Sequence, residues 1–386
     1  MKTEGEIIKK SKVLFYAYNG TGLGHLMRLA KIASGIDSSF LPLLVSAHEA
    51  IGFIYFDGTE YIRIPDFKEK EISTISASER LSQKKLMLWN IINIYKPTAI
   101  IIDHLPTGKK EELLELILNY KCKKYLVLRG EIGSKHLIDN IIFTNKNNNL
   151  LTNHFDKIFI ACDKNITNFD NVNNIPHVVK NKFDYMGYVA IKVNIETVKD
   201  IRGKFLKNGK TKWVVCSSGG GKLGTDLIKT CISLSKNKKF EDYQFDIIYG
   251  FYSPLKWEYE PYDTVEISAN LRLSRNLPNL YLLHASADIV VCSGGYNSLT
   301  EALQGITKHI YSYSVQIESN EQKENIKKLK KYYPITEIDN LTKLEEIILK
   351  NENFGINSPQ FLDKVNFDGI ENINNQILND LCSQNI

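Results

Sequence analysis

Short apolar runs alternate along the chain with longer segments of helical periodicity, such as "KEELLELILNY". The runs are apolar on both faces, which is typical of strands in parallel sheets that helices cover. The first half of the chain has such runs at 12–18, 40–46, 99–103, 124–128 and 157–161. The second half has them at 212–217, 245–250, 281–283, 288–293 and 309–313. The pattern predicts an α/β protein with two series of strands.

Two such series predict two Rossmann-like, doubly wound domains that face each other across a cleft. A chain of 386 residues is also too long for one ordinary core. The first series ends at "YMGYVA" (185–190), so we expect domains at 1–188 and 189–355, with a helical tail at 356–386 that packs back on them. The asparagine-rich pieces 144–153 and 165–174 are predicted to be surface loops, because Asn favours turns.

Composition narrows the class of protein. Hydrophobic residues make up 43% of the chain and charged residues 24%, as in a globular protein. The formal net charge of +5 is too small to indicate a nucleic-acid partner. The six cysteines form no CxxC pair and fit buried thiols in a reducing cytoplasm. The opening residues lack a signal-peptide core, and no apolar run approaches the roughly 18 residues of a membrane span, so we expect a cytoplasmic protein.

The first of three glycine-rich turns is "NGTGLGH", residues 19–25, between an apolar run and a helix-like segment. Its glycines permit backbone angles that other residues avoid and let a ligand approach closely. His25 stands at the edge of this turn, where it could act on a bound ligand. The alternative is a tight turn with a capping or solvent-facing histidine.

The second turn, "SSGGGKLG", spans residues 217–224 and again lies between a strand-like run and a helix. Its backbone N–H groups and the following helix dipole would bind an anion. Residues 219–224 also match the GxGxxG pattern of dinucleotide-binding proteins. That interpretation requires an acidic residue at the end of the next strand, which instead ends in Tyr249-Gly250. The pattern therefore disfavours a nicotinamide enzyme.

The third turn opens "SGGYNSLTEAL", residues 293–303. A strand-like run leads into two glycines, and the helix after them carries Glu301. This carboxylate could accept hydrogen bonds from ribose hydroxyls, or it could be a helix-dipole partner or a solvated side chain. Two anion-binding loops in one half and a histidine loop in the other are what a nucleotide-sugar site between two domains requires.

These motifs resemble those of GT-B glycosyltransferases related to the peptidoglycan enzyme that adds N-acetylglucosamine to a lipid-linked precursor. They are still more similar to a branch of predicted glycosyltransferases, and the similarity spans nearly the whole chain. The shared segments are "GLGHLMR" (22–28), "DHLPTG" (103–108), "VLRGEI" (127–132), "MGYVA" (186–190) and "SGGYNSLTEAL" (293–303). The resemblance implies an N-terminal acceptor domain, a C-terminal donor domain and a cleft between them.

The resemblance also implies roles for individual residues. His25 matches the proposed general base, Glu301 the ribose-binding carboxylate, and Leu283 and His284 the place where backbone groups contact the base. The donor diphosphate would lie against Gly22, Gly24, Ser218, Gly219, Gly220, Gly221, Gly294 and Gly295. The transferred sugar would contact Asn297, Glu321 and Gln322.

The acceptor half offers further candidates. Arg129 and Glu131 follow a predicted strand and could contact the acceptor, pair with the other domain or form a surface ion pair. His104 ends another strand and could be a second cleft residue or have a packing or capping role. The peptidoglycan enzyme has an Arg near the position of Ala190, so backbone dipoles and Lys222 would have to neutralise the diphosphate here.

The activity that the resemblance implies is an inverting transfer of a hexose-type sugar from a nucleoside diphosphate sugar. The resemblance also favours uracil as the base of the donor. No D-x-D pair occurs in the sequence, so we expect no metal and no cofactor. Two alternatives remain: a nucleotide-sugar hydrolase like that of the pseudaminic acid pathway, and a binding subunit without activity. The acceptor is not identified. Lysine-rich pieces at 108–110, 121–124 and 323–331 suit either a peripheral membrane contact or solvated faces.

Overall fold

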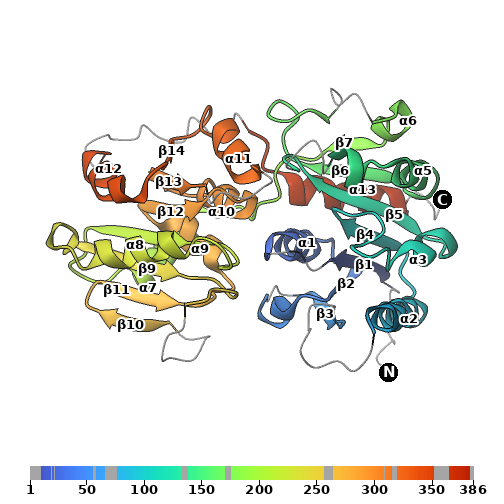
Figure 1. The fold of residues 1–386 in the computed structure, drawn as a ribbon, viewed down its shortest axis with the longest axis horizontal. Helices are drawn as coiled ribbons and strands as arrows, with labels where there is room; N and C mark the ends of the chain where they lie inside the picture. The colour runs from blue at the N-terminus through green and yellow to red at the C-terminus, as the bar shows by residue number, and fades with distance from the viewer. Residues whose placement is uncertain are drawn as a thin grey trace, which may run out of the picture.

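The computed structural model describes residues 10–18, 20, 22–54, 58–65, 76–132, 138–169, 175–255, 264–307, 309–314, 320–351 and 365–382. These residues form two lobes, each built on a seven-stranded sheet (Figure 1). Both sheets are covered by helices, so the α/β doubly wound architecture expected from the sequence is confirmed. None of the helices described is long and apolar enough to cross a membrane.

The first sheet is parallel throughout and has the order β3-β2-β1-β4-β5-β6-β7. Its strands are β1 (Ser11–Ala17), β2 (Phe40–Ser46), β3 (Glu60–Arg63), β4 (Ala99–Asp103), β5 (Lys123–Arg129), β6 (Lys157–Ala161) and β7 (Phe183–Tyr185). The helices of this lobe are α1 (Gly24–Ser34), η1 (Glu49–Phe53), α2 (Ala77–Tyr95), α3 (Leu114–Asn119), η2 (Ile138–Ile142), α5 (Asn145–His154) and α6 (His177–Lys180). The last helix of the chain, α13 (Gly369–Cys382), packs against α1 of the same lobe.

The second sheet has the order β10-β11-β9-β8-β12-β13-β14, with only β10 antiparallel to its neighbour. Its strands are β8 (Lys212–Ser217), β9 (Tyr243–Ile248), β10 (Val265–Ser268), β11 (Leu271–Ser274), β12 (Ile289–Ser293), β13 (His309–Tyr313) and β14 (Ile335–Glu337). Its helices are α7 (Ile195–Phe205), α8 (Thr225–Ser235), η4 (Lys238–Phe240), α9 (Leu280–Ser286), α10 (Tyr296–Ala302), α11 (Glu321–Leu329), η5 (Leu341–Lys343) and α12 (Leu344–Asn351).

The order of connections reverses at one place in each sheet. The chain runs from β1 to β2 and β3 on one side, then crosses to β4 on the other side of β1. In the second sheet β8 lies between β9 and β12 in the same way. Ligands of doubly wound proteins bind beyond the carboxyl ends of the strands at such a reversal. The histidine turn follows β1, and the other two glycine turns follow β8 and β12, so all three lie at these positions.

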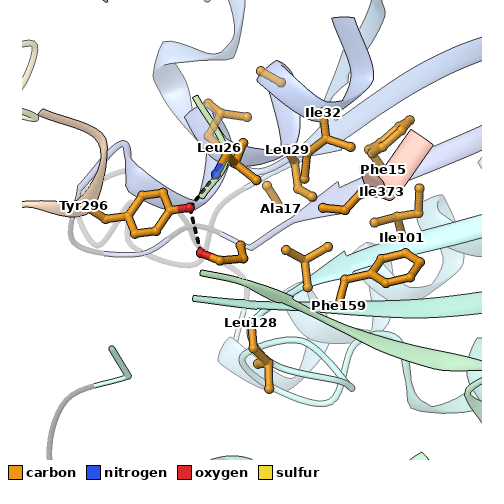
Figure 2. Packing of buried hydrophobic residues seen from close by; sticks show 14 of the residues in the cluster. Phe15, Ala17, Leu26, Leu29, Ile32, Ile101, Leu128, Phe159, Tyr296 and Ile373 are labelled. Atoms are coloured by element: carbon orange, nitrogen blue, oxygen red, sulfur yellow. Dashed lines mark hydrogen bonds between the residues drawn. The ribbon is translucent and has the colours of Figure 1, made fainter. Parts of the chain in front are cut away.

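One apolar cluster extends from the first lobe into the second, and the second lobe also has a separate cluster of its own. α1 packs against α10, and Tyr296 at the start of α10 enters the first lobe (Figure 2). Its hydroxyl accepts a hydrogen bond from the Val189 N–H at 2.7 Å and donates one to the Ala161 carbonyl at 2.8 Å. Because a buried phenol needs such partners, Tyr296 fixes where α10 meets the first lobe.

Two local predictions were wrong. The run 281–283 lies in helix α9, since three apolar residues cannot distinguish a strand from a buried helix. The asparagine-rich piece 144–153 is mostly helix α5, in which Thr144 caps the first turn and Leu150 and Leu151 are buried. In the other asparagine-rich piece, residues 165–169 contain no strand or α-helix, and residues 170–174 lie outside the described part of the chain.

Candidate active site

His25 and Asp103 meet at the carboxyl ends of β1 and β4. His25 is the second residue of α1, and its Nδ1 lies 2.5 Å from Oδ2 of Asp103, the last residue of β4. One turn along α1, the Nε and Nη2 of Arg28 donate to both oxygens of the same carboxylate at 2.8 Å. Asp103 is fully buried, so its orientation is set by these two partners. The carboxylate in turn fixes the plane of the His25 ring.

The pKa values of this group keep the His25 ring neutral, which is the protonation state in which an imidazole can accept a proton. Burial alone would raise the pKa of Asp103, but Arg28 and His25 hold it below its usual value. Burial lowers the pKa of His25 to about 4, although Asp103 opposes the shift. At neutral pH the ring is therefore uncharged and the carboxylate ionised. The carboxylate accepts the Nδ1 proton, which leaves the lone pair of Nε2 to accept another proton.

In this structure the hydroxyl of Tyr18 is hydrogen-bonded to that nitrogen. The Tyr18 hydroxyl lies 2.8 Å from the Nε2 of His25, and burial raises the pKa of the phenol. Because the phenol stays protonated, it donates to Nε2. A substrate hydroxyl that gives its proton to His25 must therefore displace Tyr18. Gly20 also borders the ring: an added Cβ would lie 3.0 Å from the Cδ2 of His25.

The glycines of the second lobe fall into two groups. A Cβ added at Gly221 would lie 2.4 Å from the carbonyl oxygen of Tyr249, and one at Gly294 would lie 2.6 Å from that of Gln322. These two glycines make room for neighbouring backbone. At Gly219 and Gly295 an added Cβ would approach, among the described residues, only Ser293 Oγ, at 3.9 and 4.0 Å. These two glycines, one after β8 and one after β12, therefore leave room beside their backbone.

The glycine turns of the two lobes touch. A Cβ added at Gly220 would lie 3.3 Å from the Cα of Gly22. The N–H of Tyr252, in the loop after β9, donates to the Gly220 carbonyl, and its hydroxyl hydrogen-bonds the Nδ1 of His48 in the first lobe at 2.9 Å. Of the other predicted residues in this region, Lys222 is exposed. The Ser218 hydroxyl donates a hydrogen bond to the Tyr249 carbonyl. The carbonyl of Gly24 accepts a hydrogen bond from the side-chain amide of Asn297.

Glu301 lies in an ionic group that links the lobes. Its Oε1 is 2.7 Å from the Nζ of Lys31 in α1, and its Oε2 is 3.0 Å from the Nδ1 of His284 in α9. The Nε2 of His284 continues to the Ser217 hydroxyl at 3.0 Å. Burial alone would raise the pKa of Glu301, but Lys31 and His284 lower it to about 2. Leu283, next to His284, is buried in the core.

The remaining predicted residues also bridge the lobes. The Oδ1 of Asn297 accepts a hydrogen bond from the Nζ of Lys31 at 3.3 Å. Arg129, at the end of β5, pairs with Glu321 at the start of α11, with 2.7 Å between Nη1 and Oε1. Glu131 pairs with Lys328, also in α11, at 2.6 Å. Of the three roles considered for Arg129 and Glu131, the structure contains pairing with the other domain.

The carbonyl of Gln322, in the first turn of α11, faces Gly294, as the clash of an added Cβ shows. Ala190 is buried in the apolar cluster that extends through both lobes.

Sequence reasoning missed four residues of the site: Tyr18, Arg28, Lys31 and the carboxylate of Asp103. A signal existed for three of them. Arg28 and Lys31 follow His25 at helical spacing in an otherwise apolar segment, which places all three side chains on one face. Asp103 ends a fully buried strand, where a polar residue is unusual.

The chain is similar to known proteins in its structure and not in its sequence. No protein-family model matches the chain, and no curated protein matches it in sequence. UGT2 of Phytolacca americana, solved with UDP-2fluoro-glucose and pterostilbene, superposes with a TM-score of 0.55 at 11% identity, over 97% of this chain and 99% of that chain. MurG of Acinetobacter baumannii gives a TM-score of 0.53 at 12% identity, over 95% and 99%. The chain has the GT-B fold.

The GT-B fold is shared by more than one class of enzyme. The UDP-GlcNAc 2-epimerase of Neisseria meningitidis, solved with UDP-GlcNAc, has a TM-score of 0.54 at 14% identity and covers 96% of this chain and 100% of its own. The two-domain GT-B architecture predicted from the sequence is confirmed. The fold alone therefore does not determine the activity of this chain.

Proposed function

We propose that the protein is a glycosyltransferase that moves a hexose-type sugar from a nucleoside diphosphate sugar to an acceptor hydroxyl, with inversion and without a metal. The observation behind the proposal is the buried group of His25, Asp103 and Arg28, which follows directly on the turn whose Gly22 approaches Gly220 of the other lobe. A neutral histidine oriented by a carboxylate is the arrangement that general-base catalysis needs.

The donor would bind to the second lobe. Its diphosphate fits the turns after β8 and β12, where Gly219 and Gly295 leave room beside their backbone. The turn after β8 leads into the eleven-residue helix α8, whose dipole favours a negative charge at that end. The peptide N–H groups would replace the metal that balances the leaving diphosphate in other enzymes. A UDP-sugar is the donor favoured by the resemblance.

Glu301 is our candidate for the ribose. A carboxylate has about four lone-pair positions, and Lys31 and His284 occupy two of them. Ribose hydroxyls would take the other two. The side chain of His284 is engaged on both nitrogens, so only the backbone at Leu283 and His284 could contact the base. Asn297, Glu321 and Gln322 remain candidates for the transferred sugar.

The transfer step follows from the geometry of His25. The acceptor hydroxyl displaces the Tyr18 phenol from Nε2, and its oxygen forms a bond to the anomeric carbon. The bond from that carbon to the diphosphate oxygen breaks, and its electron pair leaves with the nucleoside diphosphate. The hydroxyl proton passes to Nε2, and Asp103 stabilises the resulting imidazolium. Such base assistance contributes roughly 10²–10⁴-fold to the rate.

A panel of nucleotide sugars tests the proposal. Purified protein is incubated with each donor, with and without an extract of small-molecule and lipid acceptors, and nucleotide release is followed by mass spectrometry. Release that needs the extract supports a transferase. Release in buffer alone indicates the nucleotide-sugar hydrolase. No release together with measurable nucleotide affinity indicates a binding subunit.

The likeness to a UDP-GlcNAc 2-epimerase adds one more outcome to the same experiment. Conversion of a donor into an isomeric nucleotide sugar, seen by chromatography without release of the nucleotide, would assign the protein to that class. Cytoplasmic location and contact with a membrane surface stay predictions from the sequence.

A further inference from the structure

His104 has an unusual backbone conformation. It directly follows Asp103 at the end of β4 and has a φ of 66°, in the left-handed region that favours glycine. Its N–H donates to the Val127 carbonyl of the neighbouring strand at 2.9 Å. A residue other than glycine in this region costs on the order of 1–3 kcal/mol, and such costs concentrate at functional sites.

The side chain of His104 lies beside the proposed base. Its ring centroid is 5.0 Å from that of His25, and it stacks on the Tyr18 ring at 6.0 Å. The residue is 6% exposed, and within the described part of the chain nothing hydrogen-bonds its Nδ1. A buried polar atom without a partner costs about 1–3 kcal/mol. A capping role would supply a backbone partner, and a packing role would be served better by an apolar residue.

A second buried nitrogen without a partner lies at the next strand end. Arg129 ends β5, which pairs with β4, and its Nη1 contacts Glu321 while its Nε has no partner among the described residues. The charges around the site are paired: Arg28 with Asp103, and Arg129 with Glu321. The region therefore offers hydrogen-bonding nitrogens without an excess of positive charge. Such a surface fits neutral hydroxyl groups better than an anion or an apolar ring.

We propose that His104, together with Arg129, binds hydroxyls of the acceptor next to the one that His25 deprotonates, so that the acceptor presents a neutral polyhydroxyl group such as a sugar. The proposal rests on the transferase function proposed above. It assigns the unpaired Nδ1 a partner that arrives with the substrate. It also explains why the backbone holds a histidine in a conformation that glycine would adopt more readily.

Two variants separate a binding role from a structural one. His104→Gly removes the side chain and suits the positive φ, so the protein should fold with an unchanged or higher thermal midpoint. His104→Asn also tolerates this φ and keeps a side-chain amide that can hydrogen-bond. Binding is measured by saturation-transfer NMR with UDP present. The probes are methyl β-glucoside and methyl β-N-acetylglucosaminide, with phenol and 1-butanol as controls.

The proposal predicts that at least one glycoside binds the wild-type protein. His104→Gly should weaken its binding about tenfold or more, His104→Asn should restore part of it, and affinity for UDP should not change. Absence of glycoside binding to the wild type, equal binding to His104→Gly, or equal binding of phenol would overturn it. Because this readout needs no turnover, glycoside binding that depends on His104 in a protein without transferase activity would refute only the proposed function.

Discussion

Lys31 of α1 and Glu301 of α10 form an ion pair, with 2.7 Å between Nζ and Oε1, that is buried where the two lobes meet. Lys31 is inaccessible to solvent, and Glu301 is 6% exposed. The pair connects the helix that carries His25 to the helix that follows the third glycine turn. The proposed base and the proposed donor site are thereby held in a defined relation.

Breaking this pair should destabilise the protein. Lys31→Met would leave the Glu301 carboxylate buried with His284 as its remaining partner, and we expect the free energy of unfolding to fall by about 3–5 kcal/mol. The double variant Lys31→Met, Glu301→Gln should lose much less, because no buried charge remains. Urea denaturation measures both. A loss in Lys31→Met no larger than that in the double variant would show that the pair does not act as an interlobe contact.

Stability should fall as the pH drops below neutral. The pKa of His25 is lowered from 6.5 to about 4, so between these values the unfolded chain binds a proton that the folded protein does not. The free energy of unfolding should decrease over that range by up to about 1.4 kcal/mol per pH unit. Glu301, with a pKa of about 2, adds stability above its ordinary pKa of 4.5 that is lost as the pH falls toward 2.

The variant His25→Gln separates these two contributions. It should reduce the slope between pH 6.5 and 4, measured by urea denaturation at several pH values, and leave the contribution of Glu301 below 4.5 in place. Part of the slope above 4.5 remains in the variant, because burial also lowers the pKa of His104. An identical slope above 4.5 in the variant and the wild type would mean that His25 is not held neutral by burial.

The Asp103 carboxylate should matter more for turnover than the Tyr18 phenol. Asp103→Asn removes the charge that stabilises the imidazolium, and turnover should fall by roughly 10²–10⁴-fold. Tyr18→Phe keeps the ring and frees Nε2, so turnover should stay within about threefold of the wild type or rise. Steady-state kinetics with the donor found in the panel measure both. A larger loss in Tyr18→Phe would assign the phenol, in place of His25, to the proton transfer.

Two adjacent glycines should respond differently to alanine. At Gly295 the described residues leave room for an added Cβ, and the φ of −69° suits any residue, so Gly295→Ala should fold normally and bind UDP about tenfold more weakly. At Gly294 the Cβ meets α11, and Gly294→Ala should lose about 1–3 kcal/mol of stability. Calorimetric titration and thermal unfolding give the two readouts. Unchanged UDP affinity in Gly295→Ala would place the diphosphate elsewhere.

The long central strands could be predicted from the sequence, and the short strands at or next to the sheet edges could not. β1, β4, β8 and β12 are buried on both faces, and their apolar runs stand out. β3 and β10 lie at sheet edges, and most of their residues are exposed, so their sequences carry no apolar run. The helix α5 was missed because its cap and buried leucines outweigh the turn preference of its asparagines.

The candidate site divides in the same way. His25 was found because a glycine turn marks it locally. Its partner Asp103 is 78 positions away along the chain, and their contact depends on the register of β1 against β4, in which Tyr16 pairs with Ile102. Neither that register nor the partner of Glu301 across the lobes can be derived from local patterns.

The role of His25 as the base of a transferase is tested most directly by nucleoside diphosphate release from the wild-type protein and from His25→Asn, each with and without the acceptor extract. We expect release by the wild type only when the extract is present. His25→Asn should release at least a hundredfold less, with an unchanged dissociation constant for the nucleotide. Equal release with and without the extract, or equal release by the variant and the wild type, would contradict a transferase that uses His25 as its base.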